Sequence, residues 1–104
     1  MEKTKFSKHM REDRVDRYVT IATKVGFGEV FMSSTYSDKD GRWTDRTVEL
    51  TTTGVCIVKT KDGTILTMYC GTLTHIKTSF KLDRLPHELY SAITRNERHG
   101  YCNL

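Results

Sequence analysis

One stretch of the chain, residues 44–80, constrains the fold more than any other. It is rich in Val, Ile, Thr and Tyr, the residue types that favour the pleated, half-buried surface of a β-sheet. Within it, Asp62-Gly63 separates two apolar runs, and this pair is typical of a type I′ hairpin turn, in which both central residues adopt positive φ. The stretch therefore predicts an antiparallel sheet that contains a hairpin at Asp62-Gly63.

The pattern of apolar and polar residues predicts where the strands lie. Strands are expected at 29–36, 43–52, 55–61 and 64–70, and residues 72–80 resume β character as a fifth strand. The third and fourth segments are apolar on both faces, which places the third in the centre of the sheet. We expect the first strand to lie at an edge.

Helical periodicity appears on both sides of the strands. From about Ser7 to Val25 apolar residues recur at helical spacing, with Ser7 or Asp13 as the N-cap and Gly26 as the stop signal. A shorter helix is expected between Pro86 and the stop at Gly100. The stripe expected to face the sheet from the first helix is Val15, Tyr18, Val19, Ala22 and Val25.

These elements predict one α+β domain over residues 1–104. In it, an N-terminal helix packs on a four- to five-stranded antiparallel meander, and a short C-terminal helix follows. The residues expected to form most of the core are Val15, Val19, Ala22, Val48, Leu50, Val55, Ile57, Leu66 and Met68.

Composition indicates which partners, location and cofactors to expect for the protein. The net charge of +4, from 17 basic and 13 acidic residues, permits binding to a phosphate or to an acidic protein face. The three cysteines are unpaired in spacing, and no targeting segment or membrane-spanning apolar run appears, so we expect reduced thiols, a cytoplasmic location and no membrane partner. No histidine spacing matches a common metal pattern, so neither a metal nor another cofactor is expected.

The expected N-terminal helix carries a dense group of basic residues, Lys8, Arg11, Arg14 and Arg17. Arg11 falls on the side of the helical wheel that faces the core, which suits a guanidinium only where the helix overhangs the sheet and leaves a cleft. Guanidinium groups at the mouth of such a cleft would bind phosphate with paired hydrogen bonds. Alternatively, the basic residues form a solvated face, and Arg11 reaches solvent or pairs with an acidic side chain.

Candidate proton-transfer groups lie in three segments. A metal-free ribonuclease needs a base for the 2′-hydroxyl, an acid for the 5′-oxygen and cations at the phosphate. His9, Glu49 and His75, the last in the expected fifth strand, are candidates for the first two roles. The alternative is that these side chains have structural or surface roles.

The opening segment also resembles a known family. Phe6-Ser-Lys-His9-Met-Arg11-Glu-Asp-Arg14-Val is similar to the start of small domains of the barnase–EndoU–colicin–RelE type, found in phage and bacterial toxin-like proteins, many of which begin with a Ser-x-His-x-x-x-Arg helix. The position four residues after His9 holds Asp13, with arginines at 11 and 14 instead. The resemblance covers about residues 5–80. It implies an RNA-directed domain, cleaving or only binding, in which His9 and Arg14 are site residues.

A second interpretation is a non-enzymatic, phage-type inhibitor of a host or defence protein. The expected edge strand and the segment after it carry Tyr36 and Trp43, aromatic residues suited to a protein contact. Packing into the core is the alternative role for these rings. The partner is thus expected to be RNA or a host protein, and DNA is less favoured because acidic residues interrupt the basic helix.

Overall fold

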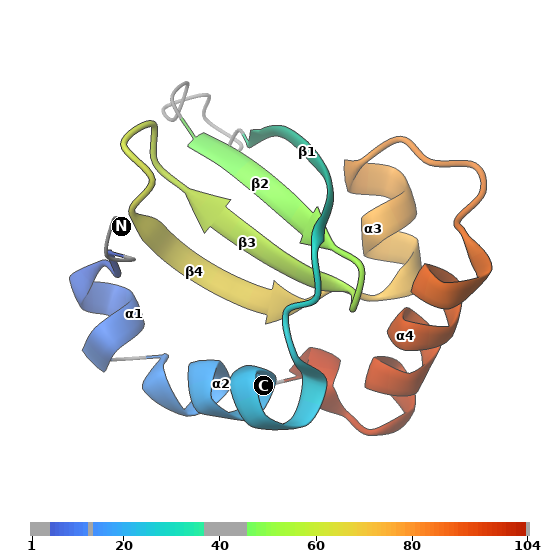
Figure 1. The fold of residues 1–104 in the computed structure, drawn as a ribbon, viewed down its shortest axis with the longest axis horizontal. Coiled ribbons are helices and arrows are strands. Elements are labelled where there is room, and N and C mark those ends of the chain that lie inside the picture. The colour runs from blue at the N-terminus through green and yellow to red at the C-terminus, as the bar shows by residue number, and fades with distance from the viewer. Residues whose placement is uncertain (1–4, 13, 37–45, 104) are drawn as a thin grey trace.

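The computed structural model describes residues 5–12, 14–36 and 46–103 (Figure 1). It has the expected α+β class: in the described residues, a four-stranded antiparallel sheet in the order β1-β2-β3-β4 is flanked by helices. The strands are β1 (Val30–Tyr36), β2 (Arg46–Thr51), β3 (Val55–Lys59) and β4 (Ile65–Cys70). The helices are α1 (Lys8–Glu12), α2 (Val15–Thr20), the π-helical turn η1 (Ile21–Val25), α3 (Leu73–Ser79), α4 (His87–Arg98) and the 3₁₀ turn η2 (Tyr101–Asn103).

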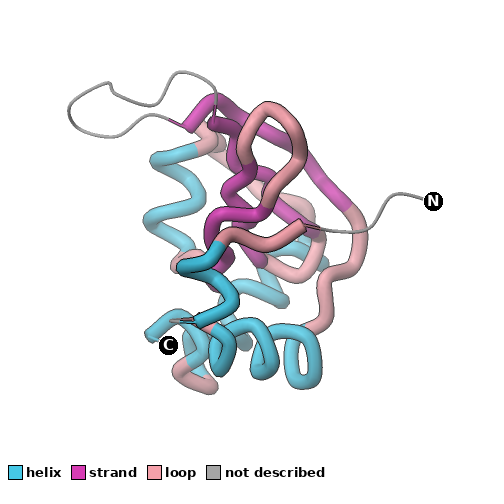
Figure 2. Tube along the Cα trace, turned by 90° about the vertical axis from the view of Figure 1, so that its left-hand side faces the viewer, coloured by secondary structure: helices cyan, strands magenta, loops and turns pink. Residues whose placement is uncertain are grey.

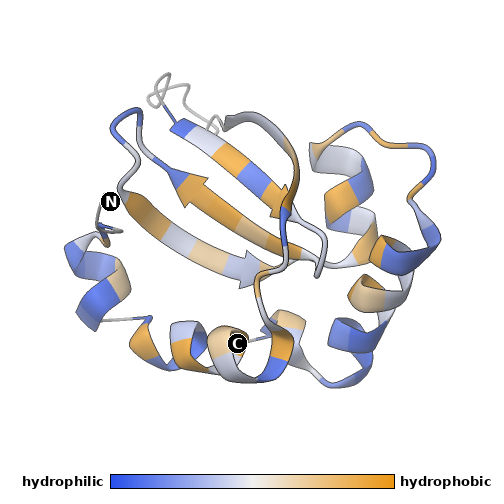
Figure 3. Cartoon of the chain, viewed as in Figure 1, coloured by the Kyte–Doolittle hydropathy of each residue, from blue (hydrophilic) through white to orange (hydrophobic). Residues whose placement is uncertain are grey.

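The strand order confirms the central place of the third strand. β3 pairs with β2 on one side and with β4 on the other, and β1 lies at the edge as expected. Figure 3 shows β3 as hydrophobic along most of its length. Residues on both faces of β3 are buried, so other parts of the chain must cover both faces of the sheet at this strand.

The hairpin between β3 and β4 is confirmed, but its predicted turn type is wrong. Among the described residues of this turn, only Gly63 has positive φ, +91°. Its N–H donates to the carbonyl oxygen of Thr60 at 3.0 Å, which closes a longer turn than the two-residue type I′. The carboxylate of Asp62 accepts the Thr60 hydroxyl and the N–H of Thr64, so Asp62 stays at negative φ.

The prediction of a fifth strand at 72–80 is wrong, because this segment forms α3. Thr72 is the N-cap, and its Oγ1 accepts the N–H of His75 at 3.2 Å. Ile76 and Phe80, one turn apart, are both buried against the sheet. Capping and helical burial therefore outweigh the β-forming tendency of the threonines and isoleucine.

The N-terminal helix is divided into α1, α2 and η1, and its buried side differs from the prediction. Ser7 caps α1, since its Oγ accepts the N–H of Met10 at 3.2 Å. Gly26 ends η1 at φ +79° with a hydrogen bond to the carbonyl oxygen of Ile21. Val15 and Val19 remain 45% and 50% exposed, and Ala22 is exposed too, so these three are not core residues.

The buried residues of this region are instead Met10 and Ile21, with Tyr18 and Val25 partly buried beside them. The end of α1 at Glu12 gives each helix its own rotation about its axis, and the π-helical turn changes the periodicity again. A single helical wheel drawn over residues 7–25 therefore points to the wrong side.

Two hydrophobic clusters, one on each face of the sheet, form the core. Cys56 and Val58 of β3 join α3 and α4 in one cluster, whereas Val55 and Ile57 join α1 and η1 in the other. Figure 2 shows helices beside and below the strands. The predicted core residues Val48, Leu50, Val55, Ile57 and Met68 are buried, and Leu66 is partly exposed.

The C-terminal helix follows the prediction closely. Pro86 immediately precedes α4, Leu89 and Ile93 are buried, and Gly100 follows its last turn at φ +77°. Among the described residues, no helix combines the length and the apolar character needed to cross a membrane.

Candidate anion-binding site

The segment before α1 is hydrogen-bonded to the free edge of β4. The N–H of Ser7 donates to the carbonyl oxygen of Ile65 at 2.9 Å, and the N–H of Ile65 donates to the carbonyl oxygen of Lys5 at 2.8 Å. The Ser7 hydroxyl also donates to the carbonyl oxygen of Leu66 at 3.0 Å. This short parallel pairing fixes the start of α1 at the edge of the sheet.

Arg17 of α2 reaches the same edge further along. Its Nη1 donates to the carbonyl oxygen of Met68 at 3.3 Å. Figure 1 shows α1 and α2 following the outer side of β4. The N-terminal helices therefore occupy the edge of β4, the strand edge opposite β1.

A cleft of about 400 Å³ opens where these helices meet the sheet. Because side chains alternate along a strand and Val58 pairs with both Val48 and Thr67, Val58 and Thr67 lie on the same sheet face as Arg46. The described residues that line the cleft are Ser7, His9, Arg14, Arg17, Arg46, Val58, Leu66 and Thr67.

Basic groups from separate elements converge on this cleft. His9 comes from α1, Arg14 and Arg17 from the start of α2, and Arg46 from β2, and none of the described lining residues is acidic. Burial, and then the charge of the nearby Arg14, lowers the pKa of the Arg17 guanidinium. An anion in the cleft would offset this repulsion and accept hydrogen bonds from the planar guanidinium groups, as a phosphate does.

The structure brings together part of the predicted basic group. His9, Arg14 and Arg17 line the cleft, whereas Lys8 is exposed and is not among its described lining residues. Arg11 lines a separate apolar hollow of about 200 Å³ with Phe6, Met10, Val15 and Tyr18.

The cleft also includes three residues that were not predicted as site residues from the sequence, Arg46, Ser7 and Thr67. Arg46 could have been found, since it lies two residues before Val48 in the predicted second strand and so shares its face. The signal at Ser7 predicted only a helix cap. Thr67 had no signal that distinguished it from the other threonines of the sheet.

Glu49 and His75, the predicted partners of His9, lie elsewhere. Glu49 projects from the sheet face opposite Val48, where its Oε1 lies 2.8 Å from Lys59 Nζ. His75 lies on α3, and its Nε2 is 2.8 Å from the Tyr69 hydroxyl. Neither is among the described lining residues of the cleft.

The predicted protein-contact residues fall at the limit of the described chain. Tyr36 is the last residue of β1, and Trp43 lies outside the described residues.

Neither a metal-ligand group nor a reactive thiol is evident in the described parts of the chain. No group of three or more His, Cys, Asp or Glu side chains is placed there to hold a metal ion. Burial raises the pKa of the Cys56 thiol to about 12 and that of Cys70 to about 11. These thiols therefore stay protonated near neutral pH, and a nucleophilic role for them is unfavourable.

Comparison of the chain with protein-family models, with curated proteins and with solved structures found no match.

Proposed function

We propose that this chain is a small RNA-directed domain whose cleft binds a phosphate of the RNA backbone. The observation that supports this most directly is the convergence of His9, Arg14, Arg17 and Arg46 on one cleft without an acidic residue among its described lining. The resemblance of the opening segment to barnase–EndoU–colicin–RelE-type domains nominates His9 and Arg14 independently of that geometry.

In this proposal the arginines bind the non-bridging phosphate oxygens, and His9 is the proton-transfer group. For cleavage, the 2′-oxygen would attack phosphorus as its proton passes to a base, and the 5′-oxygen would leave as it takes a proton from an acid. The products would be a 2′,3′-cyclic phosphate and a 5′-hydroxyl, with no metal required. His9 could supply one of the two proton transfers. Such a group typically raises the reaction rate by about 10²–10⁴-fold.

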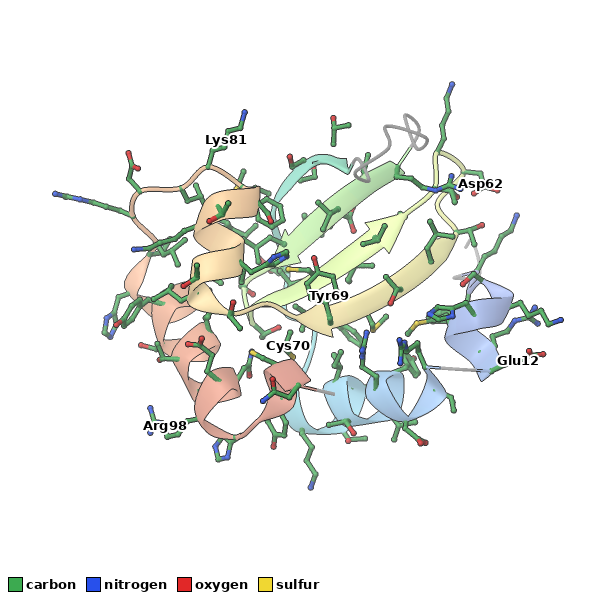
Figure 4. The ribbon with its side chains drawn as sticks, turned by 180° about the vertical axis from the view of Figure 1, so that it is seen from behind. Glu12, Asp62, Tyr69, Cys70, Lys81 and Arg98 are labelled. Atoms are coloured by element: carbon green, nitrogen blue, oxygen red, sulfur yellow. The ribbon has the colours of Figure 1, made fainter. Side chains whose placement is uncertain are left out.

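Binding is the minimal form of the proposal, and salt dependence tests it. Fluorescence anisotropy with a short single-stranded RNA should give an affinity that falls steeply with salt, because each neutralised phosphate releases counterions. Arg14→Ala or Arg46→Ala should each weaken binding and reduce the salt slope by about 1. Arg98→Ala is the matched control, since Arg98 projects from α4 on the opposite side of the molecule from α1 (Figure 4). Equal effects of all three changes, or affinity independent of salt, would contradict a phosphate site in the cleft.

Cleavage is tested separately, in EDTA, with wild type and His9→Ala. His9 is exposed, so its removal should leave the fold intact. A rate lower by about 10²–10⁴-fold in the variant, with cyclic-phosphate products from wild type, would establish His9 as a proton-transfer group. RNA binding without cleavage would leave the domain as a binding module.

A second candidate function is the inhibition of a host or defence protein through β1. In the described chain, β1 is an edge strand, and it exposes Val30 and Phe31 at 56% and 39%. Such an edge can pair with a strand of another protein. Capture of one dominant host protein that is lost on Phe31→Asp, with no RNA recovered, would favour this function over the first.

A further inference from the structure

Tyr69 continues the sheet face that forms the floor of the cleft. Tyr69 comes two residues after Thr67 on β4. Its cross-strand partner, Cys56, lies on the same face of β3 as Val58, the partner of Thr67. Successive residues on one strand face are separated by roughly 6.5–7 Å. Figure 4 shows the Tyr69 side chain over β4, beside α3. The Tyr69 ring therefore lies one step along the floor from Thr67, which lines the cleft.

His75 holds this ring in place from α3. The Tyr69 hydroxyl and His75 Nε2 are 2.8 Å apart, and the two rings meet edge to face with centroids 5.4 Å apart. The Ser79 hydroxyl lies 3.5 Å from the imidazole nitrogens, one turn further along α3. Tyr69 is partly exposed and His75 exposed, so the pair offers a fixed aromatic surface with polar edges to solvent.

We propose that the Tyr69–His75 pair is a nucleobase subsite next to the phosphate cleft, so that the ligand is a single strand of nucleic acid. This inference rests on the proposed function, because it assigns the phosphate of the same strand to the arginine cleft. A base stacked in a duplex has both faces covered, whereas an unpaired base can stack on an aromatic ring beside a basic groove. Tyr69 is two residues from Thr67, which lines the cleft, so one strand of nucleic acid can contact both the ring and the cations.

The test compares two strands that share a backbone. One is a short fluorescent single-stranded RNA, and the other is an abasic strand with the same number of phosphates. Tyr69→Leu should weaken binding of the RNA by about 5- to 100-fold, because stacking on an aromatic side chain is worth roughly 1–3 kcal/mol per base. It should leave binding of the abasic strand unchanged. Tyr90→Leu is the matched control, since Tyr90 is 46% exposed on α4 and should alter neither affinity.

His75→Ala is the second variant, because His75 is exposed and its loss should not disturb folding even if Tyr69→Leu does. It should weaken binding of the RNA and spare the abasic strand in the same way. Equal weakening of both strands, or no weakening of either, would overturn the subsite. Wild-type protein that binds both strands equally would overturn the subsite but leave the phosphate cleft standing, whereas binding to neither would overturn both.

A single-stranded DNA of the same sequence tests whether the subsite contacts the base and not the sugar. Stacking of a base on Tyr69 does not involve the 2′-hydroxyl, so the loss on Tyr69→Leu should be similar for RNA and DNA. A loss that occurs with only one of the two nucleic acids would contradict the stacking role of Tyr69.

Discussion

Arg17 donates a hydrogen bond from Nη1 to the carbonyl oxygen of Met68, 3.3 Å away, at the edge of β4. The contact joins residues 51 positions apart in the chain, so it ties α2 to the sheet rather than stabilising a local turn. It also keeps the Arg17 guanidinium beside the cleft that Arg14 and Arg46 line. Arg17 is thus both a structural link and a candidate ligand for an anion.

The structural part of this role predicts a loss of stability. Arg17→Met should lower the free energy of unfolding by about 1.5–3 kcal/mol, the usual contribution of a hydrogen bond to a charged group. The matched control is Arg14→Met, at an exposed position, which should change it by less than about 0.5 kcal/mol. Urea unfolding of the two variants measures both quantities. Equal losses would mean that the contact with Met68 does not stabilise the fold.

The two faces of β2 should differ in their effect on RNA binding. Arg46→Gln should weaken binding by about 10- to 100-fold, because it removes a charge-assisted hydrogen-bond donor from the cleft. Glu49→Gln should change binding by less than about threefold, because Glu49 pairs with Lys59 on the other face and salt screens its charge. Anisotropy titrations at physiological salt make the comparison. A larger effect from Glu49→Gln than from Arg46→Gln would mean that the RNA binds the face of Glu49 and not the cleft.

The orientation of the N-terminal helices can be tested through two neighbouring apolar residues. Ile21 is fully buried and Val19 is 50% exposed. Ile21→Ala should therefore cost about 2–5 kcal/mol of unfolding free energy, whereas Val19→Ala should cost less than about 0.5 kcal/mol. Chemical denaturation followed by circular dichroism gives both values. A larger loss from Val19→Ala than from Ile21→Ala would mean that the stripe predicted from the sequence faces the core.

Asp62 should make stability depend on pH in the acid range. The hydroxyl of Thr60, and then the backbone of Thr64, lower the pKa of the Asp62 carboxyl to about 2, against an ordinary value of about 3.9. Since the folded state has the lower pKa, the contribution of Asp62 is present above about pH 4–5 and is lost as the pH falls through about 2. The difference in Tm between wild type and Asp62→Asn should shrink over that window. A constant difference from about pH 5 to 2 would contradict the assigned hydrogen bonds.

Sequence alone determined the elements whose signals are local. The apolar run Val55–Val58 followed by Asp62-Gly63 was sufficient to predict a central strand and a hairpin, though not the turn type, because both depend on residues close together in the chain. Pro86 and Gly100 likewise bracket α4, since helix limits are set by local backbone geometry. His9 and Arg14 were predicted as site residues from the opening segment and do line one cleft.

Only the tertiary structure decided which faces are buried and which distant residues meet. Threonine-rich residues 72–80 became a helix because Ile76 and Phe80 bury against the sheet, a gain that no local propensity contains. The break between α1 and α2 turned Met10 and Ile21 inward in place of Val15 and Val19. Arg46 joined Arg14 in the cleft because strand register places Arg46 on the same sheet face as Val58 and Thr67, a relationship set by pairing across the sheet rather than by spacing along the chain.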